Sequence, residues 1–433
     1  MMKLYGKPNK VNIPFVILMF YLLFMPPILG KHSIYAVALF SWAYLFFNGN
    51  FLFKKLKFNN ILWIYLVLTV LCLWVSAMIL LNHGTTATMV HYLYWMVAVF
   101  PGAIAVSVHT QKRGEGLHYV LKLILWAGMI QSAFCMVAFV SNPIKLWLVD
   151  RLQADGTLVM TTYTNEIEYR LFGFSSGMTF DMPCVMAVIA CIGIFLGITK
   201  NYKYLLFVPT IAFSAFVNAR TSIVVMIIGI VVAFWVSGKI SAKTKARVLM
   251  TAAFALVVVI VGLIVLRQAS PTTYEWLLSG AGQILDFFRN ETDYGYFEYA
   301  TDSQKWAVPS GIGLLIGTGC RVLGANKFNI HSDIGYINDI WLGGLLYCFA
   351  VYSLVALSLI KVKRDADKTG DKMAVRFIVL TYALSLPIMN IKTYIISLGA
   401  FTTLLIIVGV YVCTTGTNGV ERYLRRVFDT VSK

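Results

Sequence analysis

Residues 331–361 read HSDIGYINDIWLGGLLYCFAVYSLVALSLIK, and this stretch decides the fold. Its first part carries His331, Asp333 and Asp339, and about 20 residues without a charge follow from Ile340. An apolar helix of that length crosses the roughly 30 Å hydrocarbon core of a bilayer. The stretch therefore predicts a membrane helix that begins directly after a polar segment.

The rest of the chain has the same apolar character. Hydrophobic residues make up 59% of 433, charged residues make up 13%, and the mean hydropathy is +0.76. A soluble domain carries far more charge, so the composition indicates a polytopic membrane protein. The apolar runs are continuous rather than alternating, which indicates helices.

The pattern predicts an all-α fold that forms a single membrane domain over residues 1–433. The first run lacks a small-x-small cleavage site and contains Pro26-Pro27, so we expect it to be a retained helix rather than a signal peptide. About twelve spans are expected, at 12–29, 32–53, 60–81, 87–108, 117–140, 174–198, 203–217, 221–237, 248–266, 337–361, 374–391 and 394–413. Connections are short except for two outward segments, 141–173 and 267–339.

The net charge of +17 is explained by topology. With the N-terminus inside, the segments that face inward hold 24 of the 36 lysines and arginines, which is the positive-inside bias. Both termini are then cytoplasmic. Thirteen of the nineteen carboxylates fall on the outward side, which we interpret as the working surface. A nucleic-acid partner is therefore not expected.

The sequence gives no signal for a metal or another cofactor. Cys320 is the one cysteine expected to face outward, and no Cys/His ligand spacing occurs. The pairs Gly311/Gly313 and Gly317/Gly319 lack the βαβ context of a dinucleotide fingerprint. Asp365-Ala-Asp367 lies in a short inward loop among lysines, and we interpret it as a solvated loop.

Three outward arginines lie next to helix ends: Arg170, Arg220 and Arg321. Each of them could simply snorkel to headgroups or pair with a nearby carboxylate. Together they favour an anion site, because guanidinium groups bind phosphate oxygens in pairs. Asp181 is expected about one turn into the sixth span, as a functional group or a partner for Arg170.

His331 is the histidine with charged neighbours, since Asp333 and Asp339 follow it and Arg321 precedes it. A neutral imidazole can take a proton from a sugar hydroxyl, whereas an isolated histidine is more often structural. Aromatic side chains nearby are candidate sugar platforms, although for any one of them an interfacial aromatic belt is the more common explanation. These candidates are Tyr294, Tyr296, Tyr299, Trp306 and Tyr336.

The segment from about Arg170 to Tyr347 resembles the O-antigen polymerase (Wzy-type) family and, more distantly, the O-antigen ligases. The resemblance rests on short pieces in order, and Lys305 stands before Trp306 where family members often carry an arginine. These pieces are Arg170-Leu-Phe-Gly173, Asp181-Met-Pro183, Asn218-Ala-Arg-Thr-Ser222, Trp306, Ile316-Gly-Thr-Gly319, His331-Ser-Asp-Ile-Gly-Tyr336 and Gly343-Gly-Leu-Leu-Tyr347.

The resemblance implies metal-independent joining of oligosaccharide repeat units carried on undecaprenyl diphosphate, at the periplasmic face of the bacterial inner membrane. His331 would be the base, with Asp333 or Asp339 as orienter or alternative base, and the three arginines would clamp the diphosphate. Lys305 and Asp181 would support them. We expect the arginines and His331 to converge in one cavity that opens sideways to lipid.

The implied partners are the lipid-linked oligosaccharide, membrane lipid, and a chain-length regulator and flippase of the same pathway. Two alternatives stay open. One is a ligase that transfers finished polymer to the lipid A core, and the other is a flippase or transporter without catalysis, which would show charges near the bilayer midplane.

Overall fold

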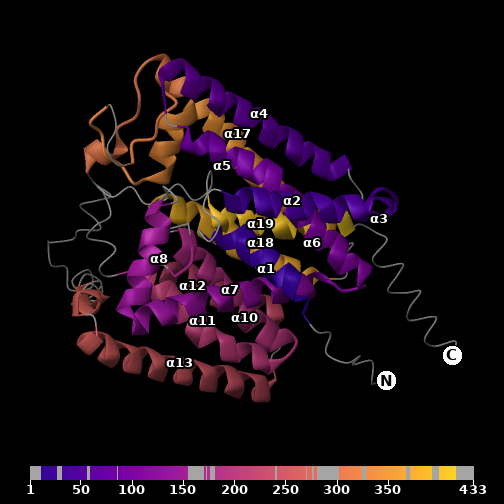
Figure 1. Cartoon of the computed structure of the whole chain (residues 1–433), viewed down its shortest axis with the longest axis vertical. Coiled ribbons are helices and arrows are strands. Elements are labelled where there is room, and N and C mark those ends of the chain that lie inside the picture. Colours follow the sequence, from indigo (N-terminus) through magenta and orange to yellow (C-terminus); the bar gives the residue numbers. More distant parts are fainter. Residues whose placement is uncertain are drawn as a thin grey trace.

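A computed structural model describes residues 11–26, 32–55, 59–84, 86–154, 170–171, 173–175, 181–238, 241–269, 271–275, 277–279, 302–323, 328–366, 371–392 and 399–415. Over these residues every regular element is a helix (Figure 1). The all-α prediction is thus confirmed for the described part of the chain.

The first half of the chain contains α1 (Ile13–Phe24), α2 (His32–Phe47), α3 (Gly49–Lys55), α4 (Asn59–Asn82), α5 (Ala87–Tyr94), the π-helical η1 (Trp95–Val99), α6 (Phe100–Lys112), α7 (Leu117–Val140) and α8 (Asn142–Ala154). The second half contains α10 (Asp181–Thr199), η2 (Tyr202–Phe207), α11 (Val208–Asn218), α12 (Ser222–Ser237), α13 (Ala242–Ala269), η3 (Ser303–Trp306), α16 (Ile312–Ile316), α17 (Gly335–Ala366), α18 (Lys372–Asn390) and α19 (Ala400–Thr415).

The helices are those of a polytopic membrane protein. Within the described residues, 7 helical stretches are long and apolar enough to cross a bilayer, and four further apolar helices are shorter. Every span expected from the sequence overlaps a helix of the structure. The count of twelve spans and the orientation of the chain stay predictions.

The centre of one half of the molecule is α10, with α7, α11 and α12 around it (Figure 1). Small residues let these helices approach closely. A Cβ at Gly128 would lie 2.6 Å from Ile189, and one at Gly229 would lie 2.5 Å from Cys191. As a result, α10 is almost entirely buried, whereas α13 at the edge is mostly exposed over its described residues, with Leu266 as a buried exception.

The irregular helix over residues 87–112 follows from Pro101. A proline inside a helix has no N–H for the carbonyl of residue i−4, which here is Val97. The chain widens into the π-helical η1 directly before this point. The indole N–H of Trp42 on α2 then donates to the Val97 carbonyl at 3.2 Å, so the freed acceptor is satisfied from a neighbouring helix.

Two boundaries differ from the sequence expectation. The sixth span was placed at 174–198, but Gly173 to Ser175 are not helical and α10 begins at Asp181. Gly173 has a φ of 59°, and a Cβ there would lie 2.7 Å from the Cys135 sulfur, so the chain turns here against α7. The outward segment 141–173 also begins as helix α8 rather than as loop.

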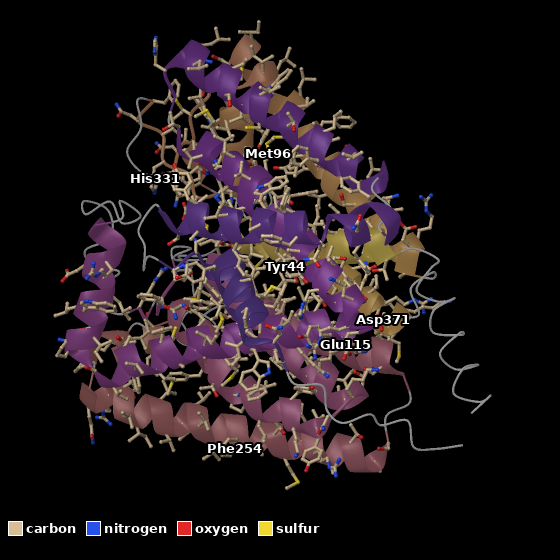
Figure 2. The ribbon with its side chains drawn as sticks, turned by 45° about the vertical axis from the view of Figure 1, so that its right-hand side comes forward. Tyr44, Met96, Glu115, Phe254, His331 and Asp371 are labelled. Atoms are coloured by element: carbon tan, nitrogen blue, oxygen red, sulfur yellow. The ribbon has the colours of Figure 1, made fainter. Side chains whose placement is uncertain are left out.

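His331 and Asp371 mark opposite ends of the bundle (Figure 2). At the Asp371 end, the carboxylate accepts from the Leu117 N–H at 2.6 Å and pairs with His118 at 2.9 Å, which ties the start of α18 to the start of α7. Burial alone would raise the pKa of Asp371, but the hydrogen bond and charge of His118, the Leu117 N–H and the charge of Lys200 lower it overall. The candidate chemistry lies at the other end.

Candidate functional site

The polar segment 302–323 folds onto the first part of α17, where this helix is broken. Gly344 has a φ of 76°, which interrupts the helical hydrogen bonds and frees the carbonyls before it. Thr318 donates its N–H to the Trp341 carbonyl at 2.7 Å, and Gly319 donates to Leu342 at 3.1 Å. The break in α17 therefore holds the glycine-rich segment in place.

Gly317 and Gly319 allow this contact because glycine has no side chain. A Cβ at Gly317 would lie 2.5 Å from the Gly343 backbone, and one at Gly319 would lie 2.4 Å from the Met78 carbonyl of α4. The third freed carbonyl, that of Gly343, accepts from the Trp74 indole on α4 at 3.3 Å. The segment is thus wedged between α17 and α4, and Cys320, expected to face outward, is buried.

Asn338 joins the segment around Val322 to the segment around Ser332 and Ile334. Its side-chain oxygen accepts from the Val322 N–H, and its amide group donates to the carbonyls of Ser332 and Ile334. Ser332 in turn donates its hydroxyl to the Lys305 carbonyl at 2.7 Å. The side chains carried by these segments therefore have defined positions.

Arg321 and Asp339 form a partly buried ion pair. The guanidinium lies 4.0 Å from the carboxylate, and the side chain of Asp339 is 0% exposed. The other carboxylate oxygen accepts from the Tyr352 hydroxyl at 2.8 Å, which lies past the helix break. Asn390 of α18 donates to the same hydroxyl at 3.4 Å. A buried carboxylate is stable only with such partners, so this network positions the arginine.

Asp333 lies between two lysines from different segments. Lys392 at the end of α18 is 3.5 Å away, and Lys305 of η3 is 4.0 Å away. Burial raises the pKa of Asp333, while the charge and hydrogen bond of Lys392 act against this rise. Burial and the charge of Lys392 lower the pKa of Lys305. Two cations share the Asp333 carboxylate, and Asp302 lies close enough to Lys305 to act against the lowering of its pKa.

We call Lys305, Arg321, Asp333, Asp339, Tyr352 and Lys392 the loop–α17 site. His331 lies at its rim, exposed, two residues before Asp333 (Figure 2). Trp306 is 42% exposed on the same segment, so its ring surface is available to a ligand. Tyr336 donates its hydroxyl to the Pro387 carbonyl at 3.0 Å, and its ring meets that of Tyr352 edge-on.

A groove between α17 and α18 leads away from this site. Its empty space is about 1060 Å³, counting the part that opens to the surroundings. Lys363 is the only charged residue among the described residues that line it, and Tyr336 and Tyr352 form the end next to the loop–α17 site. Tyr352 and Lys363 are eleven residues apart, which corresponds to about 16 Å along a helix. The groove is therefore apolar over most of a leaflet's thickness.

The other two predicted phosphate ligands, Arg170 and Arg220, lie near the end of α11. Asn218 at the end of α11 accepts from the Leu171 N–H and donates to its carbonyl, which fixes the backbone beside the buried Arg170. Arg220, two residues after Asn218, donates to Ser279 at 2.8 Å. The convergence of Arg170, Arg220, Arg321 and His331 in one cavity stays a prediction.

Asp181 has a structural partner that the sequence did not suggest. Its two carboxylate oxygens accept from the N–H groups of Ala400 and Phe401, at 2.6 and 3.0 Å. It thereby caps the N-terminus of α19, where carboxylates are favoured. A side chain at Gly399 would clash with this carboxylate, so glycine is required before the helix. The expected pairing with Arg170 is replaced by this cap.

Some expectations fall outside the described residues, namely those for Tyr294, Tyr296 and Tyr299. Within the described ranges, no three metal-ligating side chains come together. Lys392 and Tyr352 are site residues that sequence reasoning missed. A signal existed for Lys392, because it is a cation in the short outward connection between two predicted spans, 374–391 and 394–413.

No protein-family model matches this chain, and neither the curated proteins nor the solved structures give a match.

Proposed function

We propose that this chain is a membrane glycosyltransferase that joins lipid-diphosphate-linked oligosaccharides, as an O-antigen polymerase does. The observation that carries the proposal is a cationic cluster at the end of an apolar groove between α17 and α18. The groove suits a hydrocarbon tail, and the cluster suits the anionic head of the same molecule. In this proposal the cluster faces the periplasm of a bacterial inner membrane, in accord with the charge bias of the loops.

The cations would stabilise the leaving group. In the reaction, an acceptor hydroxyl oxygen attacks the anomeric carbon of the donor sugar, and the bond from that carbon to the diphosphate oxygen breaks. The diphosphate leaves as an anion without needing a proton, so fixed positive charge is the main requirement. Lys305 and Arg321 of the polar segment 302–323 and Lys392 at the end of α18 supply this charge.

The acceptor proton needs a base. His331 is exposed at the rim, and Asp333 beside it has a raised pKa, which makes its carboxylate a better proton acceptor than an ordinary aspartate. Asp339 is fully buried and bonded on both oxygens, so it acts as a positioning residue for Arg321. In this proposal Asp333 is thus the alternative base, and Asp339 is the residue that orients Arg321.

Arg170 and Arg220 keep their proposed role as phosphate ligands. Asn218 and Gly173 fix the backbone around Arg170, which is a suitable mount for a side chain that binds a phosphate or an acidic sugar. Trp306 and Tyr336 are the described aromatic residues that could stack on a sugar ring at the loop–α17 site.

The test is the length distribution of the surface polysaccharide. We expect Lys392→Met and His331→Ala each to abolish long chains while the protein level persists. Lys122→Met is the matched control. Lys122 on α7 lies over the ring of Tyr204 in η2, away from the site. Normal ladders in both site variants would refute the assignment.

A deletion of the gene distinguishes polymerase from ligase. Lipid A core that carries a single repeat unit indicates a lost polymerase, whereas complete loss of attached sugar indicates a lost ligase. Accumulation of lipid-linked units on the cytoplasmic side would instead indicate a flippase and would contradict both.

A further inference from the structure

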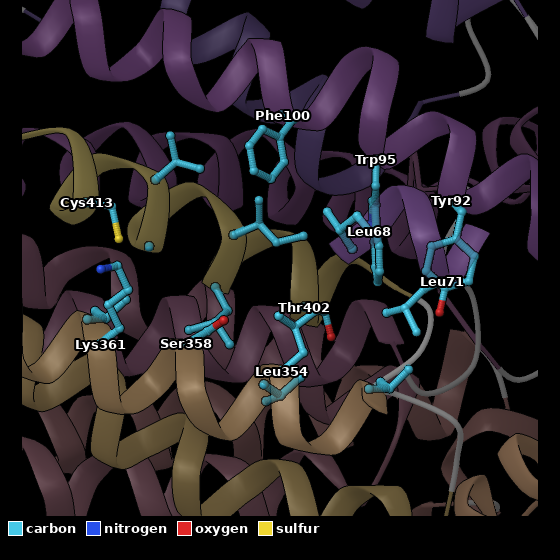
Figure 3. A pocket seen from close by; sticks show the side chains of 17 residues that line it. Leu68, Leu71, Tyr92, Trp95, Phe100, Leu354, Ser358, Lys361, Thr402 and Cys413 are labelled. Carbon is cyan, nitrogen blue, oxygen red and sulfur yellow. The ribbon is translucent and has the colours of Figure 1, made fainter. Parts of the chain in front are cut away.

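A second apolar cavity lies on the other side of α17 (Figure 3). Its empty space is about 750 Å³, counting the part that opens to the surroundings, and lies between α4, α5, η1, α6, α17 and α19. Tyr92 and Leu71 lie at one end of it, and Lys361 and Cys413 lie at the other. None of the arginines, aspartates or histidines discussed above lines this cavity, so it is separate from the loop–α17 site.

The lining suits a hydrocarbon chain rather than water. Buried water needs two to four polar partners, and few polar groups line this space. The hydroxyl of Tyr92 does not need a polar ligand in the cavity, because it is hydrogen-bonded to the hydroxyl of Tyr347 at 2.5 Å. The middle of the cavity is formed by side chains such as Phe100, Leu354 and Leu405. A linear apolar chain would fill it without leaving a polar group unsatisfied.

Charge at one end indicates which amphiphile fits. Among the described residues of the lining, Lys361 is the only charged one, and its ammonium lies 3.7 Å from Asp365, one turn further along α17. Lys363 and Arg364 follow on the same turn, so this end of the helix is net positive. An anionic headgroup here would gain a cation, while its acyl chain would enter the apolar cavity.

The wall formed by α4 leaves room for such a chain to enter. Only 33% of its apolar stretch, Tyr65–Asn82, is buried. The polar bond from α4 to α17, between Trp74 and the Gly343 carbonyl, lies near the end remote from Lys361. Near Lys361, the separation of α4 from α17 is not fixed by such a bond among the described residues.

We propose that this cavity binds one acyl chain of an anionic phospholipid from the cytoplasmic leaflet, with Lys361 at its headgroup. The bound lipid fills the space between α4, α17 and α19 and stabilises their packing. This site is independent of the glycosyl-transfer reaction.

The experiment uses the detergent-purified full chain with added phosphatidylglycerol or phosphatidylcholine. Native mass spectrometry counts retained lipids, and the thermal unfolding midpoint reports stabilisation. We expect phosphatidylglycerol to bind more tightly and to raise the midpoint more. Lys361→Gln should weaken phosphatidylglycerol binding about fivefold, as expected for one lysine at an anionic headgroup. Lys363→Gln is the matched control, because Lys363 lines the other groove, and it should change binding less than twofold.

Two variants fill the cavity from opposite walls, Gly409→Leu on α19 and Ser358→Phe on α17. A Cβ at Gly409 makes only an ordinary contact, 3.6 Å from Val362, so the larger side chain can enter the empty space. Both variants should lose the stabilisation by either lipid, and Ser358→Phe covers the case in which Gly409→Leu fails to fold.

Three results would overturn the proposal. Equal losses in Lys361→Gln and Lys363→Gln would indicate general surface charge. Unchanged lipid retention in the folded filled variants would place the lipid elsewhere. Displacement of phosphatidylglycerol by one equivalent of a polyprenyl phosphate would identify a carrier lipid as the occupant.

Discussion

Asp339 carries the most deeply buried charge of the loop–α17 site. Its carboxylate holds Arg321 on one side and Tyr352 on the other. Removal of one partner from a buried ion pair costs about 3–5 kcal/mol, because the remaining charge stays unpaired. Arg321 is 11% exposed, so solvent compensates part of this loss.

We therefore expect Asp339→Ala to lower the free energy of unfolding by about 3 kcal/mol and to abolish long chains. Tyr352→Phe removes one hydrogen bond and should cost about 1 kcal/mol. Thermal unfolding and polysaccharide ladders measure both effects. An Asp339→Ala protein as stable as Tyr352→Phe would show that the ion pair contributes little.

Asp333 gives a pH-dependent prediction. Burial raises its pKa in the folded protein above that in the unfolded chain, so folding favours the protonated form. Its contribution to stability is then fully present below the unfolded pKa and is lost as the pH rises through the folded pKa. Asp333→Asn should remove this dependence, so the variant should gain stability relative to the wild type between acid and neutral pH. If the free energy of unfolding of the two proteins changed equally with pH across that range, the assignment would be contradicted.

Single residues were predictable where a charge stood out against an apolar background. Arg321, Asp333 and Asp339 were found in this way, and the structure brings them into one region. Tyr352 was not found, because it lies within an apolar span and faces Asp339 only as a result of the Gly344 break. The contacts of each arginine, such as that of Arg220 with Ser279, depend on tertiary packing, which sequence spacing does not contain.

At the scale of elements, the break in α17 is the feature that mounts the site. Gly344→Ala places a Cβ 2.3 Å from the Leu315 backbone, at a φ of 76°. The conformation alone costs about 1–3 kcal/mol for a non-glycine residue, and the clash adds to it. We expect a lower unfolding midpoint and loss of long chains. Gly49→Ala is the control, since no atom lies within 4 Å of its Cβ position. Equal unfolding midpoints and equal chain lengths for Gly344→Ala and Gly49→Ala would exclude a role for the break in α17.

The cap of α19 makes a second prediction for an element. Asp181→Ala removes the acceptor for the Ala400 and Phe401 N–H groups and should cost about 1–2 kcal/mol. Asp181→Asn keeps an acceptor oxygen and should retain most of that stability. If Asp181 served chiefly in catalysis, both variants would instead lose activity at unchanged unfolding midpoints.

Helix positions followed from the sequence because apolar runs of about 20 residues require membrane spans. Helix starts were less predictable. The run at 174–198 includes apolar residues before Asp181, and Gly173, with its turn against Cys135, precedes the helix. Helix α8 was missed because segment 141–173 was interpreted from its charges as one loop. The irregular η1 follows from Pro101, but its repair by Trp42 requires the neighbouring helix.

For the whole molecule, the groove between α17 and α18 is the proposed route for a lipid substrate. Ala383 lines it, and the adjacent Leu384 is 48% exposed outside it. Ala383→Trp should obstruct the groove and reduce chain synthesis at least tenfold, whereas Leu384→Trp should have little effect. Radiolabelled polymer from membranes measures both rates. Comparable activity of the two variants would place the substrate elsewhere.

The close contact of Gly317 and Gly319 with Gly343, Gly344 and Met78 has an evolutionary consequence. Here the main chain itself, and not a side-chain pattern, is the recognised surface. Mutation is free to alter the neighbouring side chains, but a methyl group at these glycines would force the two segments apart. Distant homologues should therefore be detectable by paired glycines at this separation, even where the rest of the alignment has drifted beyond recognition.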